Sequence, residues 1–162
     1  MPTIEVTTYR ERERPIRRKI SSSTSASDLA NLRTFKVAKV SLAGTAVNGF
    51  PFTWQNPEPN VIIIHEIIIR ITTKGGTPGA LLNVDVVATA ADTSNTIYNA
   101  LDLDAAANIY SSHNVADSGA AGDEKPHVVD EKDGANDWVT GKCTVQACTG
   151  LVGAVYIFYT EV

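Results

Sequence analysis

The segment from Val61 to Thr73, VIIIHEIIIRITT, constrains the fold of this chain more than any other. Seven of its thirteen residues are isoleucine, and β-branched side chains favour an extended strand over a helix. Because side chains alternate between the two faces of a strand, one predicted face consists of Val61, Ile63, Ile67, Ile69 and Ile71. The second consists of Ile62, Ile64 and Ile68, interrupted by Glu66 and Arg70. Such a strand must be covered on both faces, and we expect the domain core on one face and a subunit interface on the other.

Other segments carry the two-residue period of strands, and none carries the 3.6-residue period of a long amphipathic helix. The clearest are Thr34–Ala43, with a bulge where its apolar positions change parity, Leu82–Ala88, Trp138–Cys148 and Leu151–Tyr159. The last is again apolar on both faces, so the residues expected at a subunit interface are Ile62, Ile64, Ile68, Tyr156 and Phe158. The sequence predicts an all-β fold, an antiparallel β-sandwich of the jelly-roll kind with an extended N-terminal arm.

Composition narrows the class of protein. The chain has 162 residues, 20% of them charged, and a mean hydropathy of -0.05, which is typical of one globular domain and not of a disordered acidic chain. Unbroken apolar runs such as Val61–Ile64 are far shorter than a membrane-spanning helix requires. The first fifteen residues contain no apolar stretch of the kind found in secretory signals. We therefore expect no association with a membrane.

Charge is distributed unevenly along the chain. Residues 1–20 hold six basic and three acidic side chains, which gives them a net charge of +3. Because the whole chain has a net charge of -4, the remaining residues carry a net charge of -7. A Ser-rich stretch follows, and the expected division is an arm over residues 1–33 and a sandwich over residues 34–162. A basic arm before an acidic body is typical of a tail that binds an acidic partner. The expected partner-binding residues are Arg10, Arg12, Arg14, Arg17 and Arg18.

Three readings of this arm are open. Glutamates alternate with Arg10, Arg12 and Arg14, which favours an acidic protein surface over nucleic acid, because interleaved carboxylates weaken binding to phosphates. A nucleic-acid partner is therefore not expected, although an accessory protein that binds nucleic acid stays a hypothesis. The third reading is a solvated terminal tail without a partner.

The residues that usually carry chemistry do not form a recognisable site. Cys143 and Cys148 would lie on opposite faces of one strand, roughly 16 Å apart, so we expect buried free thiols in an intracellular environment unless the strand breaks between them. The histidines are scattered, and no G-x-S-x-G elbow, P-loop or dinucleotide fingerprint is present. The acidic loop from Asp117 to Asp137 lacks the ligand spacing of a calcium loop. We expect no catalytic residue, no cofactor, no metal site and no enzymatic activity.

Two stretches carry a family resemblance. IYNALDLDAAANIYSS (Ile97–Ser112) and DWVTGKCTVQACTGLVGAVYIFYTEV (Asp137–Val162) resemble small jelly-roll structural proteins of tailed bacteriophages, namely head decoration (cement) proteins and minor virion proteins. The resemblance covers about Val61 to Val162. It implies a non-enzymatic subunit, often trimeric, that binds the major capsid protein and copies of itself on the capsid surface after assembly in the host cytoplasm. An alternative is the carbohydrate- or receptor-binding head of a phage fibre or tail protein, which would expose an aromatic platform around Trp54 or Trp138.

Overall fold

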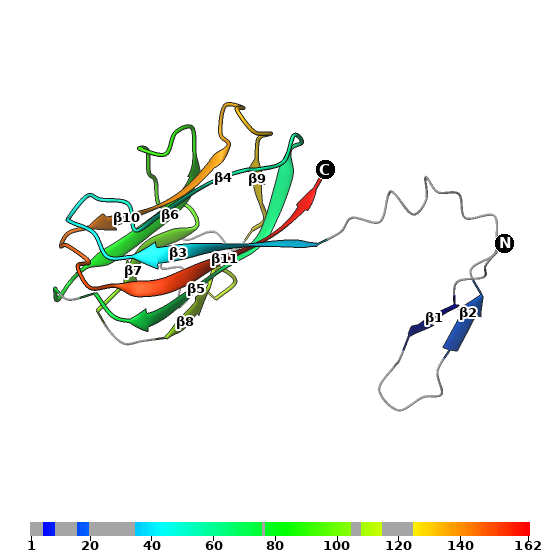
Figure 1. Ribbon diagram of the computed structural model, residues 1–162, viewed down its shortest axis with the longest axis horizontal. Coiled ribbons are helices and arrows are strands. Elements are labelled where there is room, and N and C mark those ends of the chain that lie inside the picture. The colour runs from blue at the N-terminus through cyan, green and yellow to red at the C-terminus, as the bar shows by residue number, and fades with distance from the viewer. Residues whose placement is uncertain (1–4, 9–15, 20–34, 76, 105–107, 115–124) are drawn as a thin grey trace. The chain divides into compact units, whose positions relative to one another are not determined.

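The computed structural model describes residues 5–8, 16–19, 35–75, 77–104, 108–114 and 125–162. The chain divides into two compact units, Met1–Arg33 and Thr34–Val162. In the first unit, β1 (Glu5–Thr8) and β2 (Ile16–Lys19) pair antiparallel, with Glu5 opposite Lys19 and Thr8 opposite Ile16. In the second unit, all regular elements among the described residues are strands (Figure 1). They are β3 (Lys36–Ala43), β4 (Phe52–Gln55), β5 (Ile62–Thr73), β6 (Leu81–Val87), β7 (Tyr98–Asp102), β8 (Ile109–Ser111), β9 (His127–Val129), β10 (Trp138–Thr144) and β11 (Val152–Glu161).

These nine strands form two antiparallel sheets. The four-stranded sheet has the order β4-β10-β6-β7, and the five-stranded sheet has the order β3-β11-β5-β8. The fifth strand of this second sheet is β9, which also pairs with β5. β8 and β9 lie one after the other along the edge of β5 that does not pair with β11, with β8 opposite Ile68–Arg70 and β9 opposite Ile62–Ile64. The prediction of an all-β fold with antiparallel sheets is therefore confirmed. Among the residues that the structure describes, no helix is long and apolar enough to cross a membrane.

The two sheets share one hydrophobic core, as in a β-sandwich. Aliphatic side chains of both sheets enter a single buried cluster, including Leu42, Ile67, Ile69, Val155 and Ile157 from one sheet and Leu82, Val84, Val139 and Cys143 from the other. The buried hydroxyl of Tyr98 on β7 donates a hydrogen bond to the carbonyl of Ile67 on β5 at 2.8 Å. Because a buried hydroxyl is costly without a partner, this bond fixes how the two sheets face each other.

A β-bulge in β5 overturns the predicted division of the isoleucine segment into two faces. Phe158 pairs with Glu66 and Tyr159 pairs with Ile64, so His65 is an extra residue on β5. An extra residue reverses the alternation of side chains on either side of it. Ile62 and Ile64 consequently point into the core, where they are 0% and 1% exposed, and only Ile68 of the three expected interface isoleucines lies on the outer face.

The first body strand also differs from the prediction. The register of β3 with β11 is continuous from Lys36 to Ala43, without the expected bulge. Its even-numbered residues face the core and its odd-numbered residues face outward, so Val37 is exposed. A second irregularity occurs where β11 pairs with β5: Val152 lies opposite Thr73 and Gly153 opposite Ile71, so Thr72 is an extra residue on β5. A Cβ on Gly153 would lie 2.2 Å from the carbonyl oxygen of Arg70. Only glycine allows the two backbones to come this close.

Candidate interaction surfaces

The outer face of the five-stranded sheet carries a continuous apolar band, which we call the outer band. Phe158 on the central strand β11 lies between Val37 on β3 and Glu66 on β5, and Tyr156 lies between Lys39 and Ile68. Tyr156, Phe158 and Ile68 are half-buried and Val37 is exposed. All described strands of the body belong to the two sheets, so none of them covers this face. The outer band is defined as Val37, Ile68, Tyr156 and Phe158.

Polar groups surround the outer band. Lys39 Nζ lies 5.9 Å from the centre of the Tyr156 ring, and Glu66 Oε1 accepts a hydrogen bond from Ser111 Oγ at 2.6 Å. Arg70, which is exposed, follows Ile68 by two residues on the same face of β5. An aromatic and aliphatic centre with charged residues at its margin is the usual arrangement of a protein–protein interface.

His65 lies at the margin of this face, at the bulge of β5. Its ring centre is 5.0 Å from that of the exposed Phe35, and its Nε2 atom lies 2.9 Å from Thr160 Oγ1. The ring of His113 contacts the backbone carbonyl of His65. No group of three or more potential metal ligands occurs among the described residues, and the contacts of His65 are those of a packed, hydrogen-bonded side chain.

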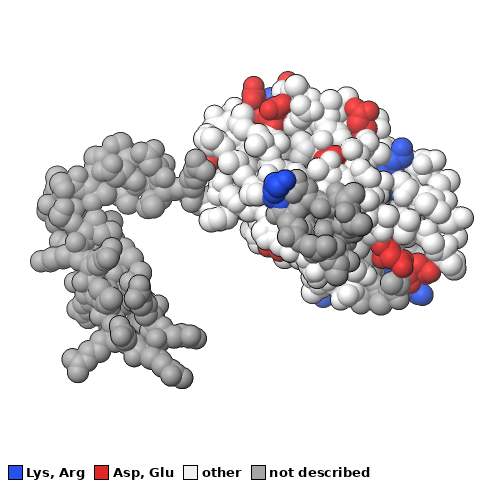
Figure 2. Space-filling view, turned by 180° about the vertical axis from the view of Figure 1, so that it is seen from behind, with Lys and Arg blue, Asp and Glu red and all other residues white. Residues whose placement is uncertain are grey.

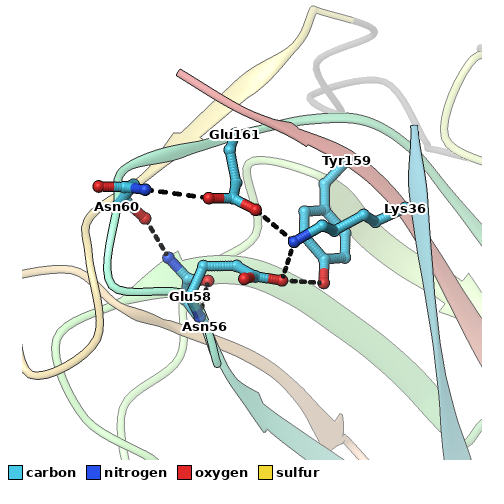
Figure 3. Close-up of polar contacts among 6 residues, drawn as sticks. All are labelled: Lys36, Asn56, Glu58, Asn60, Tyr159 and Glu161. Atoms are coloured by element: carbon cyan, nitrogen blue, oxygen red, sulfur yellow. Dashed lines mark hydrogen bonds and ion pairs between the residues drawn. The ribbon is translucent and has the colours of Figure 1, made fainter. Parts of the chain in front are cut away.

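A polar cluster at one end of the body joins β3, β11 and the connection between β4 and β5 (Figure 3). Lys36 Nζ lies 2.9 Å from Glu58 Oε1 and also forms an ion pair with Glu161. Tyr159 donates a hydrogen bond to the same Glu58 oxygen at 2.9 Å, and Asn60 Nδ2 donates to Glu161 Oε2 at 3.0 Å. We call Lys36, Glu58, Asn60, Tyr159 and Glu161 the end cluster.

Hydrogen bonding sets the protonation of the end cluster. The contacts with Glu161 and then Glu58 raise the pKa of Lys36 above its ordinary value of 10.5. The hydrogen bond from Lys36, followed by that from Asn60, lowers the pKa of Glu161. Burial and then the bond to Glu58 raise the pKa of Tyr159 to about 12. A glutamate with a lowered pKa is a poor general acid near neutral pH, so this arrangement is suited to joining strands.

The cysteines do not lie as predicted. Cys143 and Cys148 form a disulfide with Cα atoms 6.3 Å apart, because β10 ends at Thr144 and the chain turns at Val145, which has a φ of 67°. The strand therefore breaks between the two cysteines, and the expectation of free thiols is wrong. The intracellular environment inferred from free thiols loses its basis as well.

The disulfide lies where the β3–β4 connection meets the end of β10. Cys143 N donates to Gly49 O, Asn48 N donates to Cys143 O, and Cys148 N donates to Thr45 O, at 2.9, 2.9 and 3.0 Å. Both cysteines are fully buried. The crosslink thus stabilises the turn after β10 and the loop that packs against it.

Described carboxylates of the acidic loop accept hydrogen bonds from the backbone of the loop and from Gln55 of β4. Asp137, which is buried, accepts hydrogen bonds from Gln55 Nε2 at 2.7 Å and from the backbone N–H of Asp133 at 2.9 Å. Asp130 accepts one from the backbone N–H of Asn136 at 2.8 Å. Asp117, Asp123 and Glu124 lie outside the described residues.

The predicted arm residues are only partly described. Arg17 and Arg18 lie in β2, opposite Thr7 and Val6 of β1. Arg10, Arg12 and Arg14 lie outside the described residues. On the face of the body seen in Figure 2, the charged groups that are described lie in small separate patches of both signs.

Sequence reasoning missed the end cluster altogether. Lys36, Glu58 and Glu161 are separated by more than twenty residues at the least, and no spacing motif connects them. The predicted bulge in Thr34–Ala43 placed Phe35 and Val37, and not Lys36, on the core side, so the alternation gave no signal for this cluster; the continuous register of β3 turns Lys36 inward.

Comparisons with known proteins identify no relative. No protein-family model, no curated protein and no solved structure matches the chain.

Proposed function

We propose that this chain is a virion structural protein of a tailed bacteriophage, namely a decoration (cement) protein on the capsid surface. In this proposal a jelly-roll-like sandwich assembles into a homotrimer, and an extended N-terminal arm binds neighbouring subunits. The protein acts by reinforcing the capsid lattice and has no enzymatic activity. The observation that carries the proposal is the outer band, an apolar sheet face that no described strand of the body covers.

The composition of the outer band supports a role in assembly. Aromatic residues are enriched at the centres of protein interfaces, and Tyr156 and Phe158 follow each other on the outer face of β11, an interior strand of the sheet. A contiguous apolar sheet face left in water promotes uncontrolled association. Burial of this face against another subunit would remove that hazard, which is why we assign it to contacts between copies of the chain.

The charge of the arm supports binding to an acidic protein surface. The net charge of +3 in residues 1–20 contrasts with -7 in the rest of the chain, so an arm is attracted to the body of another copy as well as to an acidic capsid protein. Each such contact is weak because exposed ion pairs contribute little. Several arms on one oligomer would bind together, and the linkage of their binding events raises the overall affinity.

The test uses capsids assembled from the major capsid protein encoded in the same genome. Purified full-length protein should co-sediment with these capsids, and light scattering should give the mass of a trimer for the free protein. Deletion of residues 1–20, or replacement of Arg10, Arg12, Arg14, Arg17 and Arg18 by glutamine, should abolish capsid binding while thermal unfolding of the body is unchanged. Replacement of the same five residues by lysine keeps their charge and should preserve binding.

Two outcomes would contradict the proposal. Full capsid occupancy by the glutamine variant would remove the arm from the attachment mechanism. Absence of capsid binding by the unmodified protein would remove the decoration function and leave the fibre or tail head domain as the alternative. That alternative requires an aromatic platform, but Trp54 is half-buried and its ring centre lies 5.6 Å from that of Tyr159, so at least this indole packs within the body.

A further inference from the structure

The edge strand β3 has the properties of a site for strand addition. It is the terminal strand of the five-stranded sheet, and β11 is the one described strand that pairs with it; at its last residue Ala43 N also donates to Pro51 O at 3.1 Å. Its eight residues, KVAKVSLA, contain no proline, and their register is continuous. Proteins usually block such edges with proline, a bulge or a very short strand, because unpaired backbone groups recruit another chain. None of these three devices is present in β3. Charged side chains are a further device of this kind, and β3 carries Lys36 and Lys39, which repel a basic strand but attract one that carries an acidic residue.

The core is also incomplete along β3. Ala38 and Val40 face the core from β3 but are only partly buried, whereas Val155 and Ile157 on the neighbouring strand are 0% exposed. Apolar side chains next to a free sheet edge become buried when a further strand is added, and burial of apolar area is favourable. A strand bound at this edge would therefore gain apolar contacts in addition to its backbone hydrogen bonds.

The chain contains a strand that matches this edge. The sequence around β1, Thr3-Ile4-Glu5-Val6-Thr7, alternates apolar and polar residues, so that Ile4 and Val6 would continue the core side of the sheet beside Ala38 and Val40. The only charged residue of β1 is acidic, Glu5, and β3 carries Lys36 and Lys39 and no acidic residue. The other arm strand, β2, has the sequence IRRK and would bring like charge to the lysines.

We propose that β1 of one copy of the chain adds to the free edge of β3 in a second copy, with Glu5 on the same face of the extended sheet as Lys39. Because β2 pairs with β1, the connection that can extend runs from residue 20 to residue 35, has 16 residues and can span up to roughly 50 Å. A body of this size has a radius of gyration of about 14 Å, so the connection is long enough to reach a neighbour. The chemistry recognised at the edge is that of an extended strand with one carboxylate among β-branched residues.

This inference rests on one part of the proposed function, the assembly of several copies, and does not depend on the capsid. The test is a charge exchange in the full-length protein, with self-association measured by analytical ultracentrifugation. When two copies of the same variant associate, Glu5→Lys places two positive charges together at the edge of β3, and Lys39→Glu places two negative charges there. Each variant should therefore weaken self-association about fivefold. Lys132→Glu, at an exposed position in the turn after β9, is the matched control and should leave it unchanged.

Mixing the two variants identifies which copy supplies the strand. In the mixture, the arm of the Glu5→Lys variant can bind the edge of the Lys39→Glu variant, and the reciprocal pairing joins the native Glu5 to the native Lys39. Both pairings bring opposite charges together, so association should return to the level of the unmodified protein as a hetero-oligomer. The double variant should also associate normally. If the double variant recovers but the mixture does not, β1 binds the edge of its own body and the proposal is overturned.

The remaining results also decide the question. Unchanged association of both single variants, or a monomer at all concentrations, would overturn the exchange of strands. Capsid co-sedimentation is measured separately on the same variants. A protein that exchanges strands but does not bind capsids would support this inference and contradict the decoration function, so the two failures are distinguishable.

Discussion

Tyr159 donates its hydroxyl hydrogen to Glu58 Oε1 across 2.9 Å, which connects the last strand of the body to the loop between β4 and β5. Lys36 Nζ lies at the same distance from the same oxygen. One carboxylate oxygen therefore joins the first and last strands of the five-stranded sheet to a segment that begins in the other sheet. The end cluster is a cross-connection between the sheets, and it includes the first residue of β3.

The first prediction concerns the Tyr159 hydroxyl. Tyr159→Phe removes a hydrogen bond to a charged group from a side chain that is only 5% exposed. Because Glu58 keeps its contact with Lys36, the free energy of unfolding should fall by about 1–2 kcal/mol. Urea unfolding measures this loss, and Tyr156→Phe on the outer band should change it by less than about 0.5 kcal/mol. Equal effects of the two substitutions would contradict the role of the end cluster.

The second prediction concerns alkaline pH. The pKa of Tyr159 is raised from 10.0 to about 12 in the folded protein, and that of Lys36 is raised above 10.5. As the pH rises, both groups therefore lose their protons in the unfolded chain before they do so in the folded protein. The contribution of Tyr159 and Lys36 to stability is complete below pH 10 and is lost as the pH rises toward 12 and beyond. Melting temperatures between pH 8 and pH 11.5 should fall less for Tyr159→Phe than for Tyr156→Phe.

The third prediction concerns acid. The pKa of Glu161 is lowered from 4.5 in the folded protein, so its contribution is complete above pH 4.5 and is lost as the pH falls through the folded value. Glu161→Gln should lower the free energy of unfolding at pH 7. Below pH 4 the free energies of unfolding of the variant and the unmodified protein should differ less than at pH 7. A constant difference across this range, measured by urea unfolding, would show that Glu161 does not supply the acid dependence.

The fourth prediction concerns the disulfide. The two cysteines are five positions apart, and closing so short a loop in the unfolded chain stabilises the folded state by about 2 kcal/mol. Reduction, or the paired substitution of Cys143 and Cys148 by alanine, should lower the free energy of unfolding by that amount. Urea unfolding with and without a phosphine reductant measures the effect. If mass spectrometry of the intact, untreated protein gives a mass that includes both thiol hydrogens, the disulfide is absent and the prediction is wrong.

The fifth prediction concerns the outer band. Phe158→Glu places a carboxylate at the centre of the apolar face and next to Glu66, so self-association should weaken by at least about tenfold. Val145→Glu is the matched control, since Val145 is 65% exposed in the turn after β10 and lies outside the band. Light scattering should separate the two variants. Equal association of both would assign the contacts between copies to another surface.

The strands were predictable from sequence because their signal is local. The alternation of apolar residues and the turn-forming residues between them located β3, β5, β6 and β11 closely. The strand predicted over Trp138–Cys148 begins as β10 does but runs four residues past its end at Thr144. The faces were not predictable across a bulge. The extra residue His65 has no signature of its own in VIIIHEIIIR, and the change of parity depends on how β11 pairs with β5. Two of the five expected interface residues, Ile62 and Ile64, were misplaced for this reason.

The disulfide and the end cluster depend on information that a periodic pattern does not contain. Val145 is β-branched and continues the apolar alternation of β10, so nothing in the sequence placed a turn there; the left-handed backbone at this position breaks the strand. The partners of Lys36 come from the β4–β5 connection and from the C-terminal end of β11. Only the sheet order brings them together.

β8 and β9 both pair with the same edge of β5, so one strand anchors the chain on either side of residues 115–124. Before this stretch the contacts with β5 extend past β8, since Ser112 N donates to Ile67 O at 3.0 Å and the ring of His113 contacts the carbonyl of His65. After it they resume at His127, opposite Ile64. Because the pairing of both strands is made outside residues 115–124, a protein with a foreign peptide inserted there should melt close to its parent.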